Sequence, residues 1–398
     1  MIQRLAPHVE HPLALGSFRS WLRLLKGSGG IDREFLPRVF FVTLSTFLTS
    51  PLRRYESLRY DAAIKSTAIH PSPIFIIGHW RSGTTFLHNL LCQDENFGYV
   101  STFQAMAPGF CLIGERVLKP LLADVVRKVH PTRLIDNIPL SLDAPQEEDF
   151  AIANMSPYSF LHLFTFPRQA PFFFGRYALL DGLSGHELAM WKKVYLMVLR
   201  KATLKAGGKP LVLKSPAGSG RIRTLLELFP DAKFIHIYRN PYRVFLSTMW
   251  AYKTVLPKSQ VQKVSPEQIE AYVLKFYARL MRRLLADKAC IPAENLVEVR
   301  FEDLEAAPME QLHNIYEGLG LPGFARAELA FRAYLASVAN YQKNRYELTD
   351  ETIVKVNDHW RFALEALGYP LLEPSSPPRP KKLRRVTIRI PSPGGLMA

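Results

Sequence analysis

A glycine-rich loop constrains the fold of this chain more than any other feature of its sequence. Residues 78–85 read Gly-His-Trp-Arg-Ser-Gly-Thr-Thr. They follow Ile74–Ile77, a short apolar run rich in β-branched residues that is typical of a buried parallel strand. A helix is predicted over Thr84–Cys92. A G-x-x-x-x-G loop between a strand and a helix binds phosphate through backbone N–H groups and the helix N-terminus, so the sequence predicts a phosphate-binding loop.

The loop differs from that of a nucleoside triphosphatase at one position. A P-loop has Lys after its second glycine, and here Thr84 follows Gly83. The cation lies three residues earlier, at Arg81. Without the Lys the loop is poorly suited to a triphosphate with its magnesium ion. We expect it to hold a 5′-phosphate through backbone amides and the hydroxyl groups of Ser82, Thr84 and Thr85.

Three further strand-and-helix units follow along the chain. Strands are predicted at 211–214, 233–238 and 296–301, and each precedes a predicted helix. Strands that alternate with helices form a mainly parallel sheet covered on both faces. The predicted fold class is therefore α/β: a P-loop-like fold with a central mainly parallel β-sheet flanked by helices and interrupted by helical insertions.

The spacing of these units predicts the domain organisation. Residues 1–70 form a helical N-terminal extension, 71–372 the enzyme domain, and 373–398 a disordered basic tail. About 118 residues separate the first two units, which is too many for a plain crossover, so we expect an insertion at about 100–205. Its aromatic stretch, Phe160–Tyr177, is interpreted either as the acceptor side of the active site or as a hydrophobic sub-core.

The net charge of +16 favours an anionic partner such as nucleic acid, a membrane surface or a phosphorylated small molecule. Six basic residues and no acid lie in 374–398. No run of about 18 apolar residues suggests a membrane-spanning helix, and the nearest approach is 35–52. An amphipathic surface helix within 33–49 remains open. With no signal-peptide pattern at the N-terminus, we expect a cytoplasmic enzyme that can lie peripherally at a membrane.

Two motifs together resemble those of sulfotransferases that use 3′-phosphoadenosine 5′-phosphosulfate (PAPS). Residues 81–85, Arg-Ser-Gly-Thr-Thr, resemble the family's 5′-phosphosulfate loop. Residues 238–247 resemble its second signature, in which an Arg at a strand end and a Ser eight residues later hold the 3′-phosphate. Arg239 and Ser247 match that spacing. The resemblance covers roughly residues 72–370 and follows the bacterial branch of the family.

The resemblance also implies roles for two lysines. Lys214 ends its predicted strand and resembles a family Lys that contacts the sulfate and the leaving phosphate. Lys343, in the late basic segment 341–346, is expected to contact a phosphate of the nucleotide. Arg81 and Lys214 would stabilise the bridging oxygen as its bond to sulfur breaks, and no metal is required.

The sequence defines less clearly which residue is the base that removes the proton from the acceptor molecule. Residues 143–151 resemble an acidic segment that carries a catalytic carboxylate in the bacterial branch. Adjacent acids and partial burial raise a carboxyl pKa, which favours Glu148 as the base and Glu147 as the second choice. The same acids could instead complement a helix N-terminus. The cytosolic branch uses a His, for which the candidates are His79, His130 and His162.

Three hypotheses of function follow. The first is a PAPS-dependent sulfotransferase that acts on a hydroxyl or amine, with a fairly apolar small molecule as acceptor and the nucleotide donor as its other ligand. The second is a P-loop kinase, against which the missing loop Lys argues. The third is a basic protein that binds nucleic acid or a membrane surface. Under the first hypothesis no specific nucleic-acid partner is expected.

Overall fold

The computed structural model describes residues 11–129, 141–339 and 346–375. At its centre the described residues form a parallel sheet of four strands in the order β2–β1–β3–β4. The strands are β1 (Ile74–Ile77), β2 (Val212–Lys214), β3 (Lys233–Tyr238) and β4 (Leu296–Arg300). Every residue of β1 and β2 is buried, as expected for a sheet covered on both faces. The predicted α/β fold class is confirmed.

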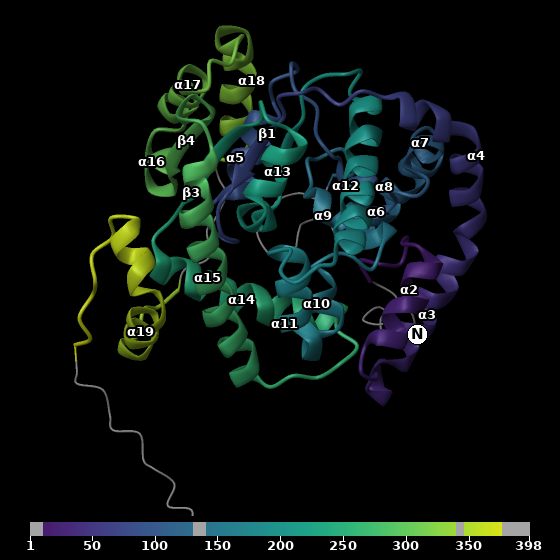
Figure 1. Ribbon diagram of the computed structural model, residues 1–398, viewed down its shortest axis with the longest axis horizontal. Helices are drawn as coiled ribbons and strands as arrows, with labels where there is room; N and C mark the ends of the chain where they lie inside the picture. The colour runs from purple at the N-terminus through teal and green to yellow at the C-terminus, as the bar shows by residue number, and fades with distance from the viewer. Residues whose placement is uncertain (1–10, 130–140, 340–345, 376–398) are drawn as a thin grey trace, which may run out of the picture.

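A helix follows each strand and returns the chain across the sheet. These helices are α5 (Thr84–Leu91), α13 (Ile222–Leu228), α14 (Pro241–Ser259) and α16 (Phe301–Ala306). The C-terminal half adds α15 (Pro266–Asp287), α17 (Pro308–Gly318), α18 (Phe324–Ser337) and α19 (Asp350–Ala366). In Figure 1, α17 and α18 lie at one end of the molecule and α14, α15 and α19 below the sheet.

The register of the sheet brings the strand ends to one edge. Ile76 of β1 pairs with Lys214 of β2, and Ile77 pairs with His236 of β3. The residues that follow β1 and β3, and the last residue of β2, therefore lie next to one another. Ligands of open α/β sheets bind at this carboxyl edge.

The insertion between β1 and β2 is built mainly from short helices. They are α6 (Thr102–Met106), α7 (Cys111–Gly114), α8 (Leu118–Val129), α9 (Glu148–Met155), α10 (His162–Thr165), α11 (Ala170–Phe173) and the long α12 (Gly185–Lys205). Helix α9 packs against α6 and α12. Helix α9, most of whose residues are buried, therefore lies inside the insertion.

The N-terminal helices α2 (Phe18–Gly27), α3 (Leu36–Leu48) and α4 (Ser50–Ser66) lie along one side of the insertion (Figure 1). Trp21 and Val42 are buried in the same hydrophobic core as the aromatic residues of the insertion. The prediction of a separate helical extension over 1–70 stays a prediction, as do the other domain limits. The tail from 376 onward lies outside the described residues.

Candidate active site

The loop after β1 has the backbone of a phosphate loop. Arg81 has a φ of 70°, in the left-handed region that non-glycine residues rarely adopt, and Gly83 has a φ of 93°. A Cβ at Gly83 would overlap the ring of Phe301, so this position requires glycine. Helix α5 begins at Thr84, and the N–H groups of its first turn have no partner within the helix. These amides are available to an anion.

Arg81 of this loop lies next to Arg239, which directly follows β3. Arg81 Nε donates to Ser247 Oγ of α14 at 2.9 Å, and Arg239 donates to the carbonyl oxygen of Arg81 at 3.4 Å. The Arg239 guanidinium also lies 4.4 Å from the centroid of the Phe301 ring. Burial lowers the pKa of Arg239. The carboxylates of Glu305 and Glu302 act on Arg239 through their charge, but among the described residues neither arginine has a carboxylate within 4.0 Å, so this partly buried positive charge suits a phosphorylated ligand.

Lys214 and Glu147 meet at the end of β2. Lys214 Nζ lies 2.5 Å from Glu147 Oε1 and donates to Thr85 Oγ1 at 3.3 Å. The lysine side chain is 1% exposed and the glutamate 13%. One cation therefore touches both the phosphate loop and a carboxylate from the insertion. These contacts hold the cation and the carboxylate in fixed positions between the phosphate loop and the insertion.

Glu148 and Asp149 point elsewhere. Glu148 is 2% exposed, and its Oε2 has no hydrogen-bond partner among the described residues. Burial, helped by the neighbouring Asp149 charge, raises the pKa of Glu148 to about 8. The raised carboxyl pKa expected from the sequence is thus present, but Glu148 does not line the cavity described next. Of the two glutamates, Glu147 is the one that does.

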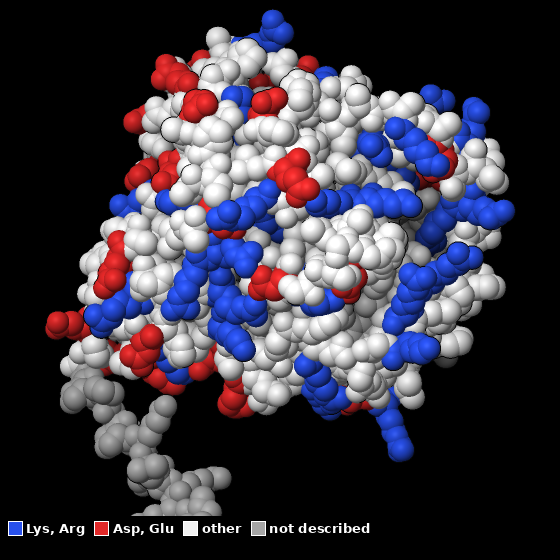
Figure 2. All heavy atoms as spheres, viewed as in Figure 1, with Lys and Arg blue, Asp and Glu red and all other residues white. Residues whose placement is uncertain are grey.

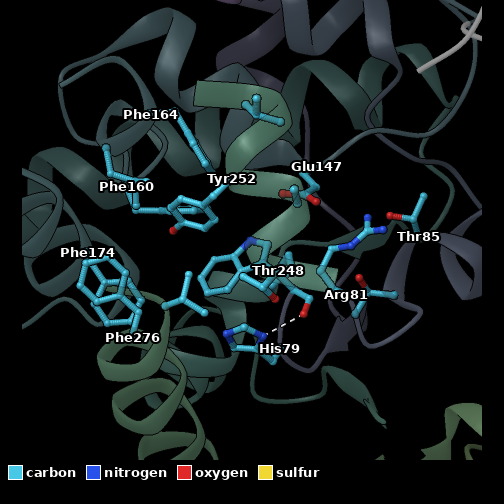
Figure 3. A pocket seen from close by; sticks show the side chains of 17 residues that line it. His79, Arg81, Thr85, Glu147, Phe160, Phe164, Phe174, Thr248, Tyr252 and Phe276 are labelled. Atoms are coloured by element: carbon cyan, nitrogen blue, oxygen red, sulfur yellow. Dashed lines mark hydrogen bonds between the residues drawn. The ribbon is translucent and has the colours of Figure 1, made fainter. Parts of the chain in front are cut away.

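A cavity of about 110 Å³ opens between the sheet edge and the insertion. Figure 3 shows Arg81, Thr85 and Glu147 at its polar end and a group of aromatic rings at the other. These rings come from the loop after β1 (Trp80), from the insertion (Phe160, Phe164 and Phe174), from α14 (Tyr252) and from α15 (Phe276). The aromatic stretch thus lines the cavity through Phe160, Phe164 and Phe174 and fills the hydrophobic core through Phe166 and Phe173, while its role as the acceptor side stays a prediction.

The histidine candidates are poorly suited to accept a proton. His79 lines the cavity, but burial lowers its pKa to about 3, and its Nδ1 hydrogen-bonds to the Trp80 carbonyl oxygen. His162 is fully buried among core residues, with its pKa lowered to about 4 by burial. His130 lies outside the described residues.

Lys343 also lies outside the described residues. The last residue of the segment 341–346, Tyr346, is among the described residues, and its hydroxyl is 3.4 Å from Ser247 Oγ. The carbonyl oxygen of Tyr346 accepts a hydrogen bond from Arg243 at 3.2 Å. Tyr346 therefore lies beside Ser247 of the expected 3′-phosphate site, and the role of Lys343 stays a prediction.

Sequence reasoning missed one buried group that supports the site. Asp149 is fully buried, and its carboxylate accepts hydrogen bonds from both terminal nitrogens of Arg221, at 2.8 and 3.1 Å, and from Ser215 Oγ at 2.5 Å. Ser215 follows Lys214 directly, and Asp149 lies two residues after Glu147. This ion pair therefore fixes the two backbones that carry the Lys214–Glu147 pair. Its only sequence signal was an acid and an Arg 72 residues apart.

Comparison with known proteins gives a consistent result. A family model described as "Sulfotransferase family" matches residues 73–326. The omega-hydroxy-beta-dihydromenaquinone-9 sulfotransferase Stf3 of Mycobacterium bovis is 34% identical over 383 residues, which cover 94% of each chain. Stf3 of Mycobacterium tuberculosis gives the same figures.

Solved structures resemble the fold as well. Sulfotransferase STF1 from Mycobacterium tuberculosis H37Rv has a TM-score of 0.65 at 19% identity, covering 86% of this chain and 92% of its own. Sulfotransferase STF9 from Mycobacterium avium has a TM-score of 0.66 at 20% identity, with coverages of 89% and 97%. At these identities the likeness concerns the fold alone.

Proposed function

This chain belongs to the sulfotransferase family, and from that premise we propose that it moves a sulfuryl group from PAPS to a hydroxyl of an apolar acceptor by in-line displacement. Family membership favours this hypothesis over a kinase or a protein that only binds polyanions. The observation that carries the proposal is that Arg81 and Glu147 both line the polar end of an aromatic cavity, where Glu147 is paired with the buried Lys214.

The residues around the loop fit the donor nucleotide. The amides of the α5 N-terminus and the hydroxyls of Ser82, Thr84 and Thr85 would hold the 5′-phosphosulfate. Arg239 and Ser247 would hold the 3′-phosphate, with Lys343 added from the late segment. When bound, PAPS supplies an activated sulfuryl group on a phosphate leaving group.

The chain's own side chains then have distinct tasks. Glu147 accepts the proton of the acceptor hydroxyl, since it lies in the cavity and 2.5 Å from Lys214. Lys214 and Arg81 place positive charge beside the oxygen that gains electrons. Because these cations are supplied by the protein, the proposed reaction needs no metal. Asp149 holds the backbone segments of Lys214 and Glu147 in place through its hydrogen bonds with Ser215 and Arg221.

The acceptor is proposed from the cavity and from the relative. Aromatic and aliphatic side chains together line most of the cavity, which suits an apolar molecule that presents one hydroxyl to Glu147. The printed name of the 34% identical relative is that of a sulfotransferase for omega-hydroxy-beta-dihydromenaquinone-9. We therefore take a hydroxylated isoprenoid quinone of this kind as the acceptor class. The proposed location is cytoplasmic, with peripheral contact to a membrane.

Two measurements test the proposal. Calorimetry with 3′,5′-adenosine bisphosphate should give micromolar affinity, with ATP much weaker and indifferent to magnesium. Transfer of labelled sulfate from PAPS should occur to an omega-hydroxylated menaquinone, should not occur to the same quinone without the hydroxyl, and should be unaffected by EDTA. Preference for magnesium–ATP would contradict the donor assignment. Equal labelling of both quinones would contradict the acceptor site.

A further inference from the structure

The α3–α4 helices carry an apolar face that the rest of the described chain leaves uncovered. Phe40 is 69% exposed, Phe47 57% and Leu58 75%. They belong to a stripe, called the α3–α4 face below, that consists of Leu36, Phe40, Leu44, Phe47, Leu48 and Leu58. Their spacing of three and four residues puts those of α3 on one side of the helix. A group of exposed apolar side chains of this kind is typical of an interaction site.

The opposite side of the same helices is bound to the protein by polar contacts. Arg38 is buried and donates to the carbonyl oxygens of Gln260 at 2.6 Å and Pro257 at 2.9 Å. Glu56, 1% exposed, forms an ion pair with Lys201 of α12 at 2.5 Å. Among the described residues, one helical stretch, 33–66, is long enough and apolar enough to cross a membrane. With a buried Arg and Glu on its inner side, it is built to lie along a surface.

Unpaired cations border the α3–α4 face. Helix α2 packs on α3 through the Trp21–Thr43 hydrogen bond, and the ring of Phe18 lies 5.5 Å from that of Phe47. The exposed cations of this region are Arg19, Arg23, Lys26, Arg33, Arg54 and Arg59. None of them forms an ion pair with a carboxylate in the part of the chain that the structure describes. Figure 2 shows mainly blue and white atoms over α2 and α3, at the lower right of the view.

From these contacts we infer that the α3–α4 face docks on an anionic lipid bilayer. Exposed Phe and Leu side chains enter the boundary between headgroups and acyl chains, and the bordering Arg and Lys side chains bind the anionic headgroups. The positive charge around the face favours an anionic bilayer over a second copy of the chain, because a second copy would present the same cations. The inference does not depend on the transfer chemistry, and binding to vesicles needs no donor nucleotide.

Vesicle sedimentation with the full-length chain tests the inference. We expect the chain to bind phosphatidylcholine vesicles that contain phosphatidylglycerol, and the double variant Phe40→Glu/Phe47→Glu to bind them at least about tenfold more weakly. The matched control is Leu329→Glu, since Leu329 is 78% exposed on α18, outside the face. It should bind like the unchanged chain. The basic tail is present in every protein, so its contribution cancels.

A second variant separates charge from apolar contact. Arg19→Gln/Arg23→Gln, at exposed positions, should weaken binding to the anionic vesicles roughly fivefold per charge at low salt, and leave binding to pure phosphatidylcholine unchanged. Affinity for 3′,5′-adenosine bisphosphate reports whether each variant is folded. The inference is overturned if folded Phe40→Glu/Phe47→Glu binds vesicles as the parent does. It is equally overturned if that variant only converts a dimer to a monomer, because the occupant would then be a second copy.

Discussion

The two sides of the cavity are built in different ways. On the donor side, short connections at the sheet edge carry Arg81, Lys214 and Arg239, each within one residue of a strand end or in the loop that follows it. On the acceptor side, Glu147 and three of the rings come from the insertion, and the other rings come from the loop after β1 and from α14 and α15. The donor side follows from local sequence, whereas the acceptor side depends on distant packing.

The largest effect should come from breaking the donor side. Arg81→Ala removes the cation that we propose to lie beside the leaving oxygen, together with the 2.9 Å contact to Ser247. We expect kcat/KM to fall about 10²- to 10³-fold, as for the loss of one group that stabilises developing charge. Affinity for 3′,5′-adenosine bisphosphate, measured by calorimetry, should fall as well. Arg332→Ala, at an exposed position on α18, is the control and should change neither. Full activity in Arg81→Ala would remove Arg81 from the mechanism.

The next effect distinguishes the two adjacent glutamates at the junction of the two sides. Glu147→Gln should lower kcat about 10²-fold or more, because the cavity loses the carboxylate that we propose as the base while the arginines of the donor site remain. Binding of 3′,5′-adenosine bisphosphate should be nearly unchanged. Glu148→Gln is the matched control, with the same chemical change one residue away and outside the cavity. If Glu148→Gln proved the less active variant, the base assignment would revert to the one favoured by the sequence.

These two variants also mark where sequence reasoning reached its limit. Strands β1 and β3 and the start of α5 lie where the apolar runs predicted them, and β4 ends one residue earlier, at Arg300. Short buried runs followed by glycine or proline carry that information locally. Adjacent residues at a helix start point about 100° apart. Which of Glu147 and Glu148 faces the cavity therefore depends on how α9 packs against α6 and α12, which no local pattern records.

A substitution on the acceptor side should have a smaller effect, confined to the KM for the acceptor. Phe164 lines the cavity, whereas Phe172, from the same aromatic stretch, is 50% exposed elsewhere. Phe164→Ala should raise KM for an apolar acceptor roughly tenfold, because one aromatic contact is lost, and should leave nucleotide affinity unchanged. Phe172→Ala should leave both constants as they are. Equal effects of the two substitutions on acceptor KM would show that the stretch acts only as a hydrophobic core.

The smallest effect concerns the interior of the acceptor side and appears in stability alone. Glu148 lies beside α12 with its pKa raised to about 8 by burial, above the value of about 4.3 in an unfolded chain. Between these values the folded state binds the extra proton, so stability falls as the pH rises, by at most about 1.4 kcal/mol per pH unit. Glu148→Gln has no carboxyl to ionise. It should melt near the unchanged protein at pH 5 and above it at pH 8.

The pH series separates this explanation from a simple packing change. A packing defect in Glu148→Gln would shift the melting temperature by a similar amount at every pH, whereas relief of a buried charge changes the difference with pH. Asp149 is the nearest acid and is held by Arg221, so the comparison needs Glu148→Gln alone, with that ion pair intact. A constant difference across pH 5 to 8 would mean that Glu148 reaches solvent or a cation when it ionises. The interior of the insertion would then be more open to water than the donor side.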